Sequence, residues 1–231
     1  MEARLPARLQ AVADYVPPGK TVADIGTDHA LLPVYLVTRG VSPRVIGVEK
    51  APGPLEAARR AVAANGLEGR IGVRAGDGLR PLKPGEARVL VLAGMGGRTI
   101  AKILDAAPAI VRAADTLVLQ PQEPVVPARR WLYANGWRIA DENLVEETGR
   151  IYLVIRAVHE RPEPVDDLLL EVGPVLAAKK HPLLGRYLHG IVQRYEKILA
   201  GLNRSGRKDL DERRAAVRAR LERLEALRKC L

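Results

Sequence analysis

The sequence has one cysteine, Cys230, among 231 residues, and it has no phenylalanine. One cysteine cannot form an internal disulfide, and no Cys/His cluster has the spacing of a zinc site, so we expect neither a disulfide framework nor a structural metal. Aromatic residues make up only 3% of the chain, which argues against a platform that stacks several nucleic-acid bases. The chain also lacks a membrane-length apolar run and a signal segment, so we expect a cytoplasmic protein without a membrane partner.

Positive charge, in contrast, is plentiful, with 37 Lys and Arg against 27 Asp and Glu and a net charge of +10. Such an excess raises affinity for polyanions and makes nucleic acid the expected partner, although it can also serve solubility alone. With so few aromatics, the nucleic-acid backbone and shape should dominate recognition. Two sets of basic residues are the first candidates for this contact: Arg4 with Arg8, and Arg204, Arg207 and Lys208. A third set, Arg129 with Arg130, is the alternative if those two do not bind RNA.

A short β-branched and apolar run over residues 21–25 ends in a glycine turn. This pattern is typical of the first strand of a parallel α/β sheet that holds a ligand at the strand's carboxyl end. A dinucleotide fold would have G-x-G-x-x-G here, whereas this turn has one glycine and the carboxylates Asp24 and Asp28. The turn therefore favours a cationic ligand such as S-adenosylmethionine (SAM) over a phosphate. The alternative is an ordinary turn in which Asp28 caps the next helix.

The rest of the first 160 residues continues the α/β pattern. Strands are predicted over residues 44–48, 71–75, 89–93 and 117–119, with helical segments between them, and residues 137–145 and 151–158 form an antiparallel hairpin. This layout is that of a class I SAM-dependent methyltransferase. It predicts a Rossmann-like α/β fold, with a mostly parallel seven-stranded sheet that ends in an antiparallel hairpin.

Two further carboxylates fall at the ends of the second and third strands. Glu49 is placed to accept the ribose hydroxyls of a nucleoside, and Asp77 to accept from an adenine amine. Each carboxylate could instead form a turn or cap a helix. Glu49 could also bind the ribose of NAD, and His29 could have a purely structural role. The predicted cofactor-binding residues are Asp24, Gly26, Thr27, Asp28, His29, Glu49, Lys50, Asp77, Gly78, Ala93 and Gly94.

The reacting centre is expected after the fourth strand, because substrates of α/β sheets bind beyond the strand ends. Residues 93–97 read Ala-Gly-Met-Gly-Gly there, in place of the Asn/Asp-Pro-Pro-aromatic motif of many amino-methyltransferases. Three glycines let the backbone approach a ligand closely, although a turn that needs positive φ would use one or two. The candidates for the reacting centre are Gly94, Met95 and Gly96, with Gln120 and Pro121 after the fifth strand.

Several stretches together resemble the TrmK family of bacterial tRNA methyltransferases. They are Asp-Ile-Gly-Thr-Asp-His-Ala at 24–30, Gly-Asp-Gly-Leu at 76–79, the 93–97 loop and Leu-Gln-Pro at 119–121, with Arg-Leu at 8–9 and Trp-Leu-Tyr at 131–133. The resemblance covers nearly the whole chain, and one departure is Gln122, where the family is expected to prefer Asn. It implies a SAM-dependent enzyme that methylates N1 of adenine 22 in tRNA. From the residues alone, a small-molecule methyltransferase and a non-catalytic RNA-binding module remain alternatives.

Beyond residue 160 the composition changes, so we expect domains over residues 1–160 and 161–231. Apolar residues recur at spacings of four and three from Leu184 to Leu202, and the pattern resumes at Leu210 after a basic turn. Two such seams joined by a short turn predict an antiparallel, coiled-coil-like helical hairpin. It could clamp RNA, form a dimer contact or be inert, and we expect a monomer or a weak homodimer.

Overall fold

The computed structural model describes residues 4–204 and 208–230. By its internal contacts the chain divides into two compact units, with the boundary after Pro164. We call residues 4–164 the sheet unit and the described residues from 165 onwards the helical unit.

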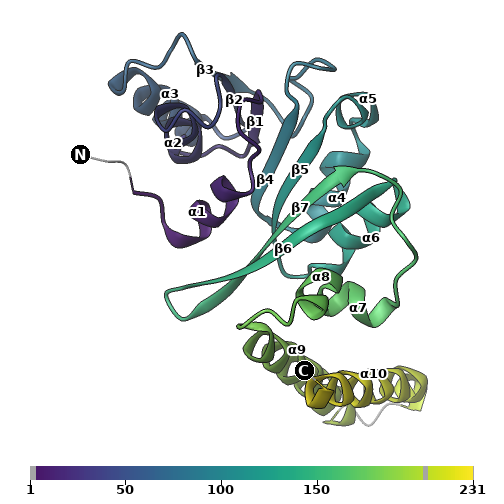
Figure 1. The fold of residues 1–231 in the computed structure, drawn as a ribbon. Coiled ribbons are helices and arrows are strands. Elements are labelled where there is room, and N and C mark those ends of the chain that lie inside the picture. The colour runs from purple at the N-terminus through teal and green to yellow at the C-terminus, as the bar shows by residue number, and fades with distance from the viewer. Residues whose placement is uncertain (1–3, 205–207, 231) are drawn as a thin grey trace. The chain divides into compact units, whose positions relative to one another are not determined.

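The sheet unit contains a seven-stranded sheet (Figure 1) in the order β3-β2-β1-β4-β5-β7-β6. Neighbours among the first five strands run parallel, while β7 is antiparallel to both β5 and β6. This arrangement confirms the predicted Rossmann-like fold. The strand order reverses at β1, whose neighbours are β2 and β4, and such a reversal opens a crevice at the carboxyl ends of the strands. The strands are β1 (Val22–Ile25), β2 (Val45–Glu49), β3 (Ile71–Ala75), β4 (Val89–Gly96), β5 (Thr116–Gln122), β6 (Trp137–Glu147) and β7 (Arg150–His159).

Helices cover both faces of this sheet, which is why the β1 and β4 sequences are almost continuously apolar. On one face α1, α2 and α3 share a hydrophobic cluster with Val22, Val45 and Val89. Helices α4 and α6 pack against each other and against the strands β4, β5 and β6. The helices of this unit are α1 (Ala7–Asp14), α2 (Leu31–Thr38), α3 (Pro52–Ala64), α4 (Gly97–Asp105), α5 (Pro108–Arg112) and α6 (Val126–Ala134).

The helical unit contains α7 (Asp167–Val172), α8 (Pro174–Ala178), α9 (Leu184–Arg204), a short 3₁₀ helix (Lys208–Leu210) and α10 (Asp211–Cys230). Helices α9 and α10 run antiparallel. Arg214, near the start of α10, donates to the carbonyl of Leu202, near the end of α9, whereas Arg228 lies 3.5 Å from the His189 ring. The predicted seam is incomplete, since Leu202 is buried but Ile198 is 37% exposed.

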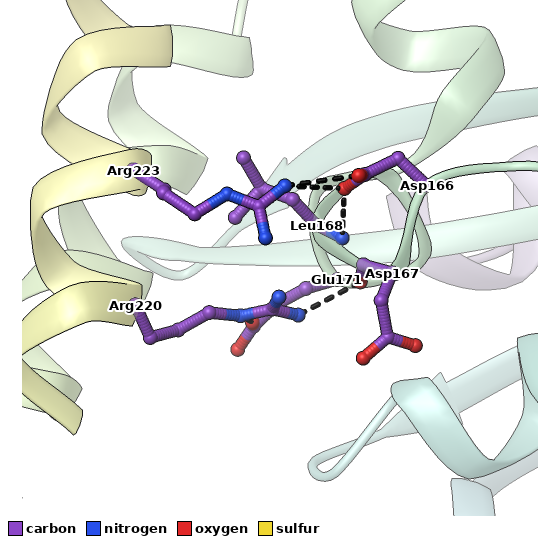
Figure 2. A network of polar contacts seen from close by, with 6 residues as sticks. All are labelled: Asp166, Asp167, Leu168, Glu171, Arg220 and Arg223. Carbon is purple, nitrogen blue, oxygen red and sulfur yellow. Dashed lines mark hydrogen bonds and ion pairs between the residues drawn. The ribbon is translucent and has the colours of Figure 1, made fainter. Parts of the chain in front are cut away.

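A polar network ties α10 to α7 (Figure 2). Asp166 caps α7 by accepting from the Leu168 amide at 2.7 Å, and both of its oxygens accept from Arg223 at 2.9 Å. These two partners lower the pKa of the Asp166 carboxyl. Arg220 donates to Glu171 and to the carbonyl of Asp167. Two of the arginines of α10 are thus already engaged within the unit.

Within the sheet unit, Arg129 of α6 and Glu142 of β6 form a fully buried ion pair. The guanidinium Nε donates to Glu142 Oε1 at 2.8 Å, and both side chains are 0% exposed. Burying two charges is favourable only when each has its partner. The pair also corrects the sequence analysis, because a fully buried Arg129 has no surface to offer RNA, and its candidacy as an RNA-binding residue is wrong.

Replacing Glu142 with Gln should destabilise the protein by about 3–5 kcal/mol, because it leaves the Arg129 cation buried without a counter-charge. Urea unfolding measures the free energy of unfolding. Arg60→Gln, at an exposed position of α3, is the control and should change it by less than about 0.5 kcal/mol. A Glu142→Gln loss no larger than the control's would contradict a structural role for the pair.

Candidate functional site

A cleft of about 290 Å³ lies at the carboxyl ends of β1 and β4. This is the edge of the sheet where the strand order reverses and where α/β sheets bind their ligands. It brings together residues from α1, the β1–α2 turn, the start of α2 and the ends of β4 and β5. The lining residues are Arg8, Leu9, Asp24, Gly26, Thr27, Asp28, His29, Leu31, Leu32, Ala93, Gly94 and Gln122.

Asp24 is the buried charge of this cleft, with 4% of its surface exposed. The pKa of its carboxyl is raised to about 6, chiefly by burial and to a smaller extent by the charge of Glu49, while the Thr27 side chain partly opposes the shift. None of these influences is a cation. The anionic form of Asp24 is therefore under-stabilised in the ligand-free protein, and a cationic group entering the cleft would relieve this.

The turn after β1 has an uncommon backbone. Gly26, Asp28 and Ala30 all have positive φ, of 74°, 49° and 55°. Non-glycine residues in this region cost of order 1–3 kcal/mol each and persist only where surrounding contacts hold them. Here the amide of Asp28 donates to Glu49 Oε2 at 3.2 Å. The carboxylate at the end of β2 thus helps to hold the turn, while His29 lies 3.5 Å from Asp28 with both side chains exposed.

The predicted ribose and adenine carboxylates lie together beside the cleft lining. Glu49 Oε1 accepts from the amides of Lys50 and Ala51 at 2.8 Å, which orients the carboxylate. Lys50 reaches across to Asp77 at 3.6 Å, and both side chains are largely exposed. Gly78 follows with φ of 61°. Glu49 and Lys50 at the end of β2 and Asp77 after β3 therefore lie at the same edge of the sheet. They adjoin the turn after β1, where Glu49 accepts from the Asp28 amide.

The loop that ends β4 packs directly on the turn after β1. A Cβ on Gly26 would lie 2.6 Å from Met95 Cε, so Met95 occupies the space that a side chain would need. Gly94 has φ of 76°, and a Cβ on Gly97 would lie 2.3 Å from the carbonyl of Pro124. Positive φ therefore explains Gly94, and close packing explains Gly97. Gly96 has neither a positive φ nor a close neighbour, because a Cβ there would lie 3.6 Å from the nearest atom.

Gln120, near the end of β5, joins this loop to α1. Its Oε1 accepts from the Gly94 amide and from Arg8 Nη1, each at 3.0 Å, and its side chain is fully buried. Pro121 pairs with Met95 across the β4–β5 ladder. The position of Arg8 in the cleft lining was not predicted from the sequence. The Arg-Leu pair at 8–9 was the only signal that pointed to it.

The other basic candidates lie apart from the cleft lining. Arg4 and Arg130, in the sheet unit, are exposed, and so is Arg204 at the end of α9. Arg207 and the side chain of Lys208 fall outside the part of the chain that the structure describes. RNA binding by the exposed residues stays a prediction.

Within residues 4–204 and 208–230, no group of three or more His, Cys, Asp or Glu side chains is arranged to hold a metal ion. Over the same residues, no helix has the length and apolar character needed to cross a membrane.

The sequence is similar to those of known methyltransferases. The model of a methyltransferase domain family matches residues 5–155. The tRNA (adenine(22)-N(1))-methyltransferase of Bacillus subtilis (strain 168) is 35% identical over 235 residues, which cover 100% of this chain and 98% of the relative.

Solved structures agree over the same length. The crystal structure of the B. subtilis m1A22 tRNA methyltransferase TrmK has a TM-score of 0.91 at 34% identity, covering 98% of this chain and 99% of that one. A Streptococcus pneumoniae protein in complex with S-adenosyl-L-methionine has a TM-score of 0.83 at 29% identity, covering 97% and 99%. The resemblance found in the sequence is confirmed, and the chain belongs to the TrmK family of methyltransferases.

Proposed function

We propose that this protein is a SAM-dependent tRNA methyltransferase that transfers a methyl group to N1 of an adenine, at position 22 of the tRNA. The observation that carries the proposal is the cleft at the ends of β1 and β4, with a buried, under-stabilised carboxylate, in a chain that matches the B. subtilis enzyme over its full length. Such an enzyme would meet its tRNA in the bacterial cytoplasm.

The residues of the cleft fit SAM. Asp24 suits the cationic amino group of the methionine part, and Thr27, which lines the same cleft, would contact the same ligand. Glu49, whose carboxylate is oriented by backbone amides, would accept from the ribose through Oε2, because Oε1 already accepts two hydrogen bonds. Asp77 would accept from the adenine amine, beside Gly78. When bound, SAM supplies an electrophilic methyl group on a sulfonium sulfur.

The protein's contribution to the reaction would be alignment and electrostatics. N1 of adenine has a free lone pair, so no general base is required, and the protein must hold the nucleophile in line with the methyl group. N1 lies on the pairing edge of the base, so a paired target must first be exposed. Backbone carbonyls of residues 94–96 would accept from the N6 amine as positive charge develops on the base. Gln120 Oε1 was an expected acceptor too, but it already accepts two hydrogen bonds.

Binding of tRNA would rest on exposed basic residues, with Arg4, Arg130 and Arg204 as the described candidates. Arg220 and Arg223 are weaker candidates, because both already bind partners within the helical unit. Removing one basic residue that binds a phosphate should reduce the magnitude of the salt slope of log affinity by about 0.9 on a duplex.

Incubation of the protein with SAM and unmodified tRNA, followed by nucleoside mass spectrometry, should yield 1-methyladenosine. Sequencing by reverse-transcription arrest should place it at position 22, and a tRNA with guanine at that position is the control. Methylation of another nucleoside, or of a small molecule without any need for RNA, would contradict the proposal. RNA binding without SAM binding would indicate a non-catalytic module.

The affinity for SAM should fall as the pH drops below about 6, by up to about tenfold per pH unit. A cation stabilises the charged form of Asp24, whose pKa in the free protein is raised to about 6, so the proton must leave on binding. The same raised pKa means that the protonated side chain favours folding, and that this contribution to stability is lost as the pH rises through 6.

Calorimetry from about pH 7.5 to about pH 5 measures the effect, with Asp24→Asn as the control, because it has no group to titrate. We expect Asp24→Asn to bind SAM more weakly at neutral pH and with less dependence on pH. A wild-type affinity that stays constant over this range would rule out contact between Asp24 and the cationic group.

Gly94→Ala should lower kcat about tenfold, because φ of 76° costs a side chain roughly 1–2 kcal/mol and the loop must shift to accommodate it. SAM affinity should change by less than about threefold. Gly72→Ala in β3 is the control, since its φ is not positive and the added Cβ would meet nothing within 4 Å. Equal losses of kcat and SAM affinity in Gly94→Ala would instead indicate a cofactor contact.

A further inference from the structure

Arg8 is held at the cleft by contacts with three strands. Its backbone amide donates to Glu147 Oε2 of β6 at 2.9 Å. Its guanidinium lies over the ring of Tyr152 in β7, with 5.7 Å to the ring centre, and Nη1 donates to Gln120 Oε1 of β5 at 3.0 Å. A side chain that binds a phosphate from solvent does not require these contacts. They fix the guanidinium at one place beside the reacting loop.

The contacts with Arg8 and with the Gly94 amide together fix how the Gln120 amide is oriented. The oxygen and nitrogen of a side-chain amide can exchange places by rotation, and only the oxygen can accept. Two donors converge here, Arg8 Nη1 and the Gly94 amide, and both require the oxygen. The nitrogen of Gln120 is buried and finds no partner among the described residues. Without Arg8, a single donor would be left to hold this orientation.

Through Gln120, the arrangement controls the backbone of the reacting loop. The β4–β5 ladder is regular up to Ala93, opposite Gln120, and its register shifts between Ala93 and Met95. At this irregularity the Gly94 amide donates to the Gln120 side chain. Because a peptide unit is planar, fixing that N–H also fixes the direction of the Ala93 carbonyl. Ala93 and Gly94 both line the cleft.

We propose that Arg8 is a positioning residue for methyl transfer, acting through Gln120 on the peptide between Ala93 and Gly94. Helix α1 then completes the active site. The sequence had suggested that Arg8 holds the tRNA backbone, and the present inference replaces that role. This inference rests on the proposed function, since it assigns a role in the same cleft. It separates Arg8 from Arg4, which is exposed and lies four residues earlier, before α1 begins.

The test compares Arg8→Met, which keeps an unbranched apolar stem but removes charge and donors, with Arg8→Lys, which keeps the charge. For each we measure kcat and KM with tRNA, SAM affinity, and the salt slope of tRNA affinity. Arg8→Met should lower kcat by roughly ten- to a hundredfold, the range for removal of a hydrogen bond to a charged group. KM for tRNA and the salt slope should stay within error of the wild type.

Arg8→Lys should recover part of kcat, since an ammonium can still donate to Gln120. Arg60→Met, an exposed position on α3, is the matched control and should leave kcat and the salt slope unchanged. Arg4→Met is the comparison for a proposed phosphate contact. It should reduce the magnitude of the salt slope of tRNA affinity by about 0.9. If Arg8→Met does not fold, Arg8→Lys carries the test, because it keeps the charge and still loses the guanidinium geometry.

A double-mutant cycle with Gln120→Met identifies the route. If Arg8 acts through Gln120, the double variant should be about as slow as Gln120→Met alone. Multiplicative losses of kcat would overturn that route, and a reduced salt slope with unchanged kcat in Arg8→Met would make Arg8 a phosphate contact. Failure of the wild type to form 1-methyladenosine would refute the proposed function itself. An active wild type with an equally active Arg8→Met would refute this inference alone.

Discussion

The close packing of Met95 on Gly26 is the constraint on which the rest of the cleft depends. The turn after β1 and the end of β4 meet there, beside the reversal of strand order, and they touch because Gly26 carries no side chain. The positive φ of Gly26 turns the chain two residues after Asp24, which is buried in β1 between β2 and β4. The turn that follows the buried carboxylate is therefore also the turn against which Met95 packs.

The electrostatics of the molecule follow from this arrangement. The chain carries a net charge of +10, yet its cleft holds a buried carboxylate whose pKa is raised, with Glu49 close by. A small cation is favoured inside the cleft, while the surface as a whole favours a polyanion. An enzyme that brings a sulfonium cofactor to an RNA needs both properties at once. In the helical unit, by contrast, Arg220 and Arg223 are engaged by acidic and carbonyl partners around α7.

The fold was predictable from the sequence because each strand is a short apolar run closed by a turn signal, and the antiparallel hairpin ends the series. Residues such as Asp24 and Glu49 could be placed for the same reason, since they lie at or near the end of a strand. Contacts between distant segments could not be predicted. Arg8 meets Gln120 across 112 positions, and nothing local marks the pairing. Arg129 looked like a surface cation until β6 brought Glu142 against it. The glycine at 97 reflects the approach of Pro124, which the sequence does not reveal.

The central claim is that N1 of an adenine is the nucleophile in this cleft. The most direct measurement is methyl transfer from labelled SAM to two otherwise identical tRNAs, one with adenosine at position 22 and one with 1-deazaadenosine, in which a C–H replaces N1. We expect transfer to the first tRNA only, with both tRNAs bound to a similar extent. Equal incorporation of label into both tRNAs would contradict it.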